Sequence, residues 1–460
     1  MKKTFIYPKL ILIFLLAMMV SCSDDDNGGE MIPDTTVVDL AVANGDLTTL
    51  VAALTRANLV TTLQGDGPFT VFAPTNAAFN AFLQANNFAS LDDVPDELLT
   101  AVLLNHVVSG NNLSTSLNTG YVSSLSTAGI NDNNLSHYID TSSGVSINGV
   151  ADVTTADVTA DNGVVHIIDA VIGLPTIVDH AVANTNLSDL VGALTANGNT
   201  TFTDLLSLPT VNFTVFAPTN DGFASFTNPN DNDIDNILGY HVVAGARLSS
   251  ELSNEYVTTT GVNDASNALS MYINTDNGVS INGTSTVVAA DIVATNGIIH
   301  AVDAVIDLPT VVTFATADSN FSTLVDALTT LTPSVDFPSV LSAQDGNGND
   351  PFTVFAPTND AFAALSAIPA EDDLIPILQH HVIAGANIRS GDLNNPGETT
   401  TPATLEGDTF TITLPGTGDN IGDITDGAGN TGIGIIAVDV QAYNGVIHVV
   451  NQVLLPDTGN

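Results

Sequence analysis

The feature that most constrains the fold is a threefold internal repeat. The heptapeptide Thr-Val-Phe-Ala-Pro-Thr-Asn begins at Thr70, Thr214 and Thr353, so its copies lie roughly 140 residues apart. A second string, Asn-Gly followed by two β-branched residues and a histidine, ends at His166, His300 and His448. This period is too long for a solenoid unit and matches a whole domain. The sequence therefore predicts three copies of one domain.

Each copy carries the same local signals for secondary structure. Apolar residues at i, i+3, i+4 and i+7, starting at Leu47, Leu187 and Phe321, predict a helix that faces a core. The segment Phe-Thr-Val-Phe-Ala-Pro predicts a strand that ends at proline, and the Thr-Asn pair after it predicts a helix cap. Gly-Val-Ser-Ile-Asn-Gly at 144–149 and 278–283 predicts a strand that turns at Asn-Gly. Each domain is therefore expected to be α+β, with a mostly β core.

Leu-Pro pairs after the second string mark the domain boundaries. They are Leu174-Pro175, Leu308-Pro309 and Leu455-Pro456. We expect a signal peptide at 1–22, an acidic tether at 23–33 and domains at 34–174, 175–308 and 309–460. Because almost no linker separates the copies, the domains should pack end to end instead of swinging on flexible tethers.

The N-terminus predicts export and lipidation. A basic start at Lys2 and Lys3, an apolar run over 10–20 and then Ser21-Cys22 resemble a bacterial lipoprotein signal, in which the cysteine becomes diacylated. Cys22 is the one cysteine in the chain, which excludes an intrachain disulfide and a cysteine-based zinc site. The Ser-Asp-Asp-Asp run after Cys22 resembles the export signal of Bacteroidetes surface lipoproteins. We therefore expect an outer-membrane protein that faces the exterior and contacts the membrane only through its lipid.

The strongly acidic composition limits the partners. Asp and Glu number 50 against six Lys and Arg, so the formal net charge is −44. Such a surface repels phosphate backbones and excludes nucleic acid as a partner. The charge fits either solubility in a salty medium or recruitment of divalent cations.

One acidic segment is a candidate calcium site. Asp231, Asp233 and Asp235 alternate oxygens as an EF-hand loop begins, but the sixth position lacks glycine and the twelfth is Val242 instead of glutamate. The alternative is that these acids complement the dipole of the helix that follows. Calcium is the one cofactor that the sequence leaves open.

Nine histidines and one serine are the candidates for a catalytic or metal-binding role. Six of the nine histidines recur once per copy, so each equivalent set is divided among three domains, and buried imidazoles bonded to the backbone are expected. Gly278–Gly283 approximates a nucleophile elbow but is one residue too long, and its serine lies in a predicted strand. No catalytic residue is assigned, and the chain is predicted not to be an enzyme.

The repeated strings, in their order and spacing, resemble those of the fasciclin (FAS1) domain family. The resemblance covers roughly residues 34–456. Thr-Val-Phe-Ala-Pro-Thr-Asn-x-x-Phe is similar to its first signature box and Asn-Gly-Val-Ile-His to its second. The resemblance implies a β-sandwich wedge with packed helices and roles in extracellular adhesion. In some animal relatives a Tyr-His pair takes part in integrin binding. Only the second copy keeps that pair, as Tyr240-His241, which are the candidate binding residues beside the alternative of core packing.

The leading hypothesis is a non-enzymatic surface lipoprotein that adheres to cells, matrix or surfaces through tandem modules. One alternative is an accessory lipoprotein that captures a glycan or protein for an uptake system, and another is a spacer without a specific ligand. The sequence does not identify the ligand. The third copy carries an insertion, assigned to the glycine-rich stretch 416–434, where a specialised face is expected.

Overall fold

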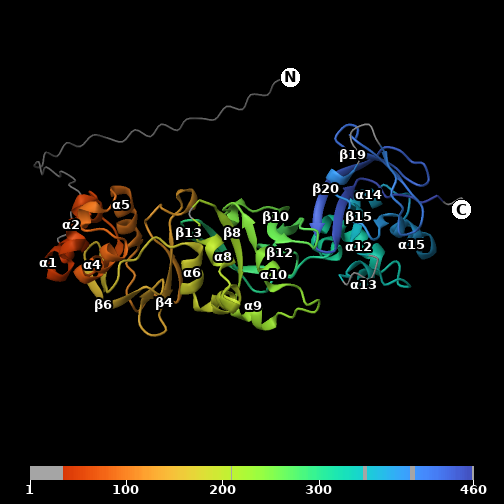
Figure 1. The fold of residues 1–460 in the computed structure, drawn as a ribbon. Coiled ribbons are helices and arrows are strands. Elements are labelled where there is room, and N and C mark those ends of the chain that lie inside the picture. The colour runs from red at the N-terminus through yellow and green to blue at the C-terminus, as the bar shows by residue number, and fades with distance from the viewer. Residues whose placement is uncertain (1–34, 209, 345–349, 394–398, 458–460) are drawn as a thin grey trace, which may run out of the picture.

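The computed structural model describes residues 35–208, 210–344, 350–393 and 399–457, which form three domains in a row (Figure 1). Cys22 and the tether at 23–33 lie outside the described residues. Within the described part of the chain, no single helix is long and apolar enough to cross a membrane. One bent pair, Val37–Ala43 with Gly45–Arg56, matches such a span by length and composition only.

The first domain sets the pattern for the other two. Its helices are α1 (Val37–Ala43), α2 (Thr48–Arg56), α3 (Val60–Leu63), α4 (Asn76–Ala85) and α5 (Asp96–Asn105). Its strands are β1 (Phe69–Pro74), β2 (Val107–Ser109), β3 (Gly120–Ser123), β4 (Ser136–Asp140), β5 (Ser146–Ile147), β6 (Ala151–Ala160) and β7 (Gly163–Ile168).

The second and third domains repeat this order. The helices are α6 (Ile177–Ala183), α7 (Ser188–Leu194), α8 (Thr201–Leu206), α9 (Asn220–Ser225) and α10 (Ile234–Tyr240), then α11 (Val311–Ala317), α12 (Ser322–Thr329), α13 (Phe337–Leu341), α14 (Asn359–Ala363) and α15 (Glu371–His380). The strands of the second domain are β8 (Phe213–Pro218), β9 (Val242–Ala244), β10 (Glu255–Val262), β11 (Ala268–Asn274), β12 (Ser280–Ile281), β13 (Ser285–Ala294) and β14 (Gly297–Val302). Those of the third are β15 (Phe352–Pro357), β16 (Val382–Ile383), β17 (Thr399–Thr400), β18 (Thr411–Thr413), β19 (Gly422–Thr425), β20 (Ile433–Ala442) and β21 (Gly445–Val450).

Each domain contains one sheet of seven strands. The order in the first is β2-β1-β7-β6-β5-β4-β3, and the third repeats it as β16-β15-β21-β20-β19-β18-β17. In the second domain, pairing of Thr259 with Val243 closes the same order into a barrel. The two signature strings form the centre of each sheet, where β1 runs parallel to β7. The α+β class and the three tandem domains predicted from the sequence are confirmed.

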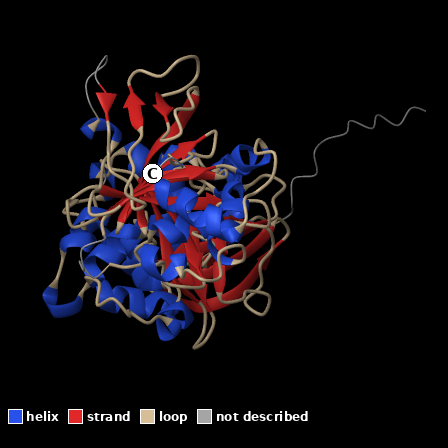
Figure 2. Cartoon of the chain, turned by 90° about the vertical axis from the view of Figure 1, so that its right-hand side faces the viewer, coloured by secondary structure: helices blue, strands red, loops and turns tan. Residues whose placement is uncertain are grey.

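Long strands bend each sheet into two layers. The start of β6 pairs with β5 and the rest with β7, and its register against β7 shifts at Thr155. Side chains from both halves, including Phe72, Ile139 and Ile147, form one core cluster. A second cluster joins the other face of β1 and β7 to the helices. Figure 2 views the chain along its length, with the helices in blue and the strands in red.

The predicted local elements are present. The strand Phe69–Pro74 has the expected bounds, and the Thr75 side chain caps α4. The expected hairpin turn follows β5, with Asn148 at φ 52° and Gly149 at φ 62°. The predicted opening helix begins as a 3-10 turn at Leu47 and continues as α2. Another helix, α1, precedes it, and neither α1 nor its counterparts α6 and α11 were predicted from the sequence.

Candidate functional site

The asparagine and glycine of the second repeated string connect the sheet to the helices in each domain. Asn162 is buried; its Nδ2 donates to the carbonyl oxygens of Leu63 and Gly65, and its Oδ1 accepts from the Val37 backbone N–H at 2.8 Å. A Cβ on Gly163 would collide with the Phe69 carbonyl oxygen, because β1 and β7 run side by side there. Asn296 and Asn444 make the same bonds in the other domains. These residues are needed for the fold, which explains why they recur.

A third repeated string, His-Val followed by valine or isoleucine, begins at His106, His241 and His381. The histidines of this His-Val string join the fifth helix of each domain to the segment after the last strand. His106 Nδ1 donates to the Val102 carbonyl at 2.7 Å, and its Nε2 accepts from the Ile172 N–H at 2.9 Å. His241 and His381 make equivalent pairs of bonds. Burial lowers the pKa of His106 to about 4, so the imidazole is neutral near pH 7. These three histidines are therefore buried imidazoles bonded to the backbone, as the sequence predicted.

Tyr240 and His241, the candidate binding pair, lie in the core of the second domain. Their exposed fractions are 0% and 2%. The Tyr240 hydroxyl donates to the Ser270 carbonyl at 2.7 Å and accepts from Asn282 Nδ2 at 2.8 Å. Burial lowers the pKa of His241 to about 4. Because both side chains use their polar atoms inside the domain, this geometry matches core packing and does not present them to a partner.

A serine, an aspartate and a histidine meet in every domain. In the first, Ser114 Oγ donates to Asp157 Oδ2 at 2.5 Å, and these bonds hold the Asp157 pKa below its usual value. His166 Nδ1 accepts from the Asp157 N–H at 3.3 Å, while its Nε2 donates to the Asn112 carbonyl at 2.9 Å. The equivalent sets are Ser249, Asp291 and His300, and Ser390, Asp439 and His448, but His448 Nδ1 makes no hydrogen bond to Asp439.

This set differs from a hydrolytic triad. A triad needs a hydrogen bond between the serine hydroxyl and the histidine. Here the hydroxyl donates to the aspartate, and the hydrogen bonds of the histidine are to backbone atoms. The aspartates have φ 61° and lie where the long strand changes register. The set therefore fixes a β-bulge. Ser280, the serine of the elbow-like string, lies within β12, as the sequence predicted.

The calcium candidates form the cap of α10. Asp233 caps the helix by accepting from the Asp235 N–H at 3.2 Å, and Asp235 accepts from Asn199 Nδ2 at 2.9 Å. Asp231 is exposed in the preceding turn with φ 53°. Within the described residues, the group of acids and histidines close enough to share one metal ion is instead His380, Glu406 and Asp408 in the third domain. The helix-dipole alternative accounts for Asp233 and Asp235.

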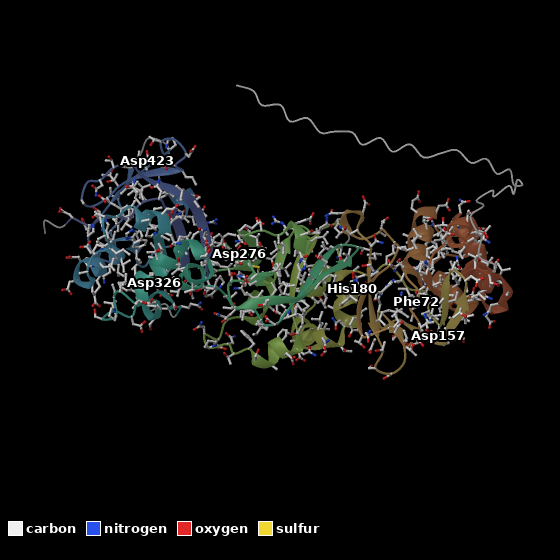
Figure 3. The ribbon with its side chains drawn as sticks, turned by 180° about the vertical axis from the view of Figure 1, so that it is seen from behind. Phe72, Asp157, His180, Asp276, Asp326 and Asp423 are labelled. Carbon is white, nitrogen blue, oxygen red and sulfur yellow. The ribbon has the colours of Figure 1, made fainter. Side chains whose placement is uncertain are left out.

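The domains are joined by a tyrosine-rich junction. Between the first two, the Val293 N–H donates to Ser136 Oγ at 2.9 Å in a buried contact. The ring of Tyr121 lies 5.7 Å from that of His180, and Asn184 donates to its hydroxyl at 3.3 Å. Figure 3 shows His180 where the two domains meet.

The second junction repeats the first. The Gln441 N–H donates to Ser270 Oγ at 2.9 Å, as Val293 does to Ser136. The Tyr256 ring lies 5.4 Å from Phe314, and its hydroxyl donates to Asp318 at 3.1 Å. Burial raises the pKa of Tyr256. Equivalent positions of the repeat thus hold both pairs of domains in similar contacts.

The chain is thus a tandem array of three copies of one α+β domain. The polar residues that recur in each copy make hydrogen bonds inside the domains and at the junctions between them. A model of the Fasciclin domain matches residues 45–175, 185–309 and 319–456, and the chain belongs to the fasciclin family. The signature strings identified in the sequence are therefore those of this family.

Relatives match one domain or the whole array. Protein sll1483 of Synechocystis sp. is 39% identical over 141 residues, which is 30% of this chain and 72% of that protein. Periostin of Homo sapiens is 26% identical over 444 residues, covering 92% of this chain and 47% of periostin. A solved FAS1 domain pair from the insect cell adhesion molecule Fasciclin I is 22% identical, with a TM-score of 0.34, and covers 59% of this chain and 95% of that chain.

Proposed function

We propose that this chain is a cell-surface lipoprotein, anchored through a lipid on Cys22, whose three fasciclin domains mediate adhesion to cells, matrix or surfaces without enzymatic activity. The observation that carries the proposal is the repeated junction between domains of an adhesion-type family. Tyr121 with Asn184 and Tyr256 with Asp318 link successive domains in the same way. A stiff array holds three surfaces in a fixed line, so weak contacts act together through effective concentration.

The adhesive contact is made by outward-facing surfaces of the array. Tyr240 and His241 are buried, so they support it through the core of the second domain. At the far end, β17 and β18 carry threonines at 399, 400, 411 and 413, in the region where the other two domains carry junction tyrosines.

The apolar cavities do not support capture of a small ligand for uptake. The apolar cavities in the second and third domains measure about 70 and 40 Å³. Sites for small molecules typically measure about 300–1,000 Å³. Neither cavity has room for a glycan, whereas a polar cleft of about 440 Å³ beside Asp96, Glu97 and Thr100 in the first domain falls within that range.

The proposal is tested in a strain that lacks this gene. The strain is complemented with the wild-type chain or with Cys22→Ala, and attachment to a surface is scored with and without a calcium chelator. Wild type should restore attachment and Cys22→Ala should not, because the unlipidated chain leaves the cell surface. Normal attachment of the deletion strain would reject adhesion. A chelator effect seen only with the wild-type chain would show that cations bridge the contact.

A further inference from the structure

His380 is the buried imidazole with the weakest hydrogen bonds. It has an exposed fraction of 0%, yet its Nδ1 lies 3.5 Å from Thr404 Oγ1 and its Nε2 lies 3.4 Å from the Gly427 backbone nitrogen, both long distances for a hydrogen bond. Each of the other eight histidines makes at least one hydrogen bond of 3.2 Å or less. Because buried polar groups are normally well paired, the poor pairing of His380 calls for a further partner.

Two carboxylates face this imidazole. Glu406 Oε2 lies 3.5 Å from His380 Nδ1, and one atom from each of His380, Glu406 and Asp408 lies within 4.8 Å of the other two. Both acids are carried by the turn between Ala403 and Thr409, which pair as an isolated bridge. Their side chains are partly exposed, so an ion can reach the group from solvent.

The spacing fits a small divalent ion. Ligand bonds of about 2.1 Å in a tetrahedron place two ligand atoms roughly 3.4 Å apart, close to the distance from Nδ1 to Oε2. Asp408 is already oriented, since its Oδ1 accepts from the Thr409 N–H and its Oδ2 from the Asp457 N–H, both at 2.8 Å. Such outer bonds hold a ligand in place while leaving lone pairs free.

Among the residues that the structure describes, such a group occurs in the third domain alone. The residue before the His-Val histidine is Asn105 in the first domain and Tyr240 in the second. Both have short bonds, Asn105 to the Gly173 carbonyl at 2.7 Å and Tyr240 to Ser270 at 2.7 Å. Gly427, in the predicted insertion, closes over the group, and a Cβ there would lie 3.1 Å from His380 Cε1.

We propose that His380, Glu406 and Asp408 bind one divalent transition-metal ion of the Zn²⁺ type. An imidazole ligand favours such an ion over calcium or magnesium, which take oxygen ligands. Two carboxylates balance the charge of the ion. Three protein ligands leave a fourth position for water or for a donor group of a partner. This site is independent of the calcium candidates at Asp231, Asp233 and Asp235 and of the adhesive role.

The test is a titration of the full chain with Co²⁺ and Zn²⁺ in excess Ca²⁺, which occupies nonspecific carboxylates. Co²⁺ binding is followed by its visible absorption, which reports the coordination geometry, and Zn²⁺ binding by displacement of Co²⁺. The variants are Glu406→Gln and His380→Asn, the latter taking the residue of the first domain. The control is Asp373→Asn, an exposed carboxylate on the same helix, α15.

The wild type and Asp373→Asn should each show one saturable Co²⁺ site with a tetrahedral spectrum. Glu406→Gln and His380→Asn should weaken it by about tenfold or more, because loss of even an outer-shell partner costs about 10–100-fold. Absence of a saturable site in the wild type would overturn the proposal, as would unchanged affinity in either variant. If His380→Asn does not fold, Glu406→Gln decides alone, because its partly exposed side chain can be changed without a core cavity.

Discussion

The Tyr256 hydroxyl donates a hydrogen bond of 3.1 Å to the Asp318 carboxylate, across the junction between the second and third domains. Tyr121 and Asn184 occupy the equivalent places at the first junction. Domains joined by short linkers commonly move relative to each other unless their interface is well packed. In this chain the junction contacts lie at equivalent positions of the repeat. Each domain therefore orients the domain that follows it in a similar way.

Tyr256→Ala should loosen the second junction. The variant loses the ring contact with Phe314 and the bond to Asp318. Small-angle scattering of the full chain should show a broader range of end-to-end distances, and limited proteolysis should cut near Pro309. The control is Tyr240→Phe, whose hydroxyl bonds lie within one domain and should not affect the scattering. Unchanged scattering of Tyr256→Ala would mean that the tyrosine does not hold the junction.

His241→Ala should destabilise the second domain by about 2–5 kcal/mol, because it leaves the Ile306 N–H and the Ile237 carbonyl buried without partners. His106→Ala and His381→Ala remove equivalent bonds and should cost similar amounts in their own domains. Thermal unfolding measures the cost in each case. A His241→Ala protein with normal unfolding but lost attachment would instead support a direct binding role for the pair.

Asp291 should show two separate contributions to stability. Asp291→Gly keeps the φ of 61° accessible but removes the bonds from Ser249, so it should cost about 1–3 kcal/mol. Asp291→Ala also forces an alanine into that conformation and should cost about 1–2 kcal/mol more. Chemical denaturation compares the two, with Asp157 and Asp439 as matched sites. Equal unfolding free energies for the two variants would exclude backbone strain as a contribution.

Acid should destabilise the fold before it protonates most carboxylates. Burial lowers the pKa of five histidines to about 4, namely His106, His137, His180, His241 and His381. In the unfolded chain their pKa returns to about 6.5, so below that pH the unfolded state binds more protons. The unfolding free energy should therefore be constant between about pH 7.5 and 9 and fall as the pH drops from about 6.5 towards 4, by at most about 1.4 kcal/mol per pH unit for each histidine.

Denaturant titrations between about pH 7.5 and 5 measure this slope. His241→Gln should lower the unfolding free energy at every pH in this range. It should also make the unfolding free energy depend less steeply on pH, because one titrating histidine is removed. Stability that increases on acidification through this range would contradict the assignment of buried, neutral imidazoles.

Secondary-structure elements that depend on neighbouring residues could be predicted from the sequence. The strand Phe69–Pro74, the Thr75 cap and the Asn148-Gly149 turn depend on neighbouring residues and were predicted. The missed helix α1 also has a local signal, because Thr36 and Asp39 form a capping box. Burial of Tyr240 could have been inferred, since it lies three residues after the buried Ile237 on the same face of α10.

Long-range contacts could not be predicted in the same way. Asn162 bonds the Leu63 carbonyl across 99 residues, and Val293 bonds Ser136 across 157. Periodicity shows which face of an element is buried but not which distant residue meets it. The grouping of His380 with Glu406 and Asp408 depends on such a contact, and their spacing along the chain does not follow a known metal-binding motif. The lipidation of Cys22 lies outside the described residues and stays a prediction.

Competition by the purified chain tests the adhesive role most directly. Soluble protein without the lipid is added in excess to the parent strain, and attachment is counted beside an unrelated protein of similar acidic charge. If the domains make the contact, the soluble chain should inhibit attachment of the parent in proportion to its concentration, and the unrelated protein should not. Undiminished attachment at saturating soluble chain would contradict the account.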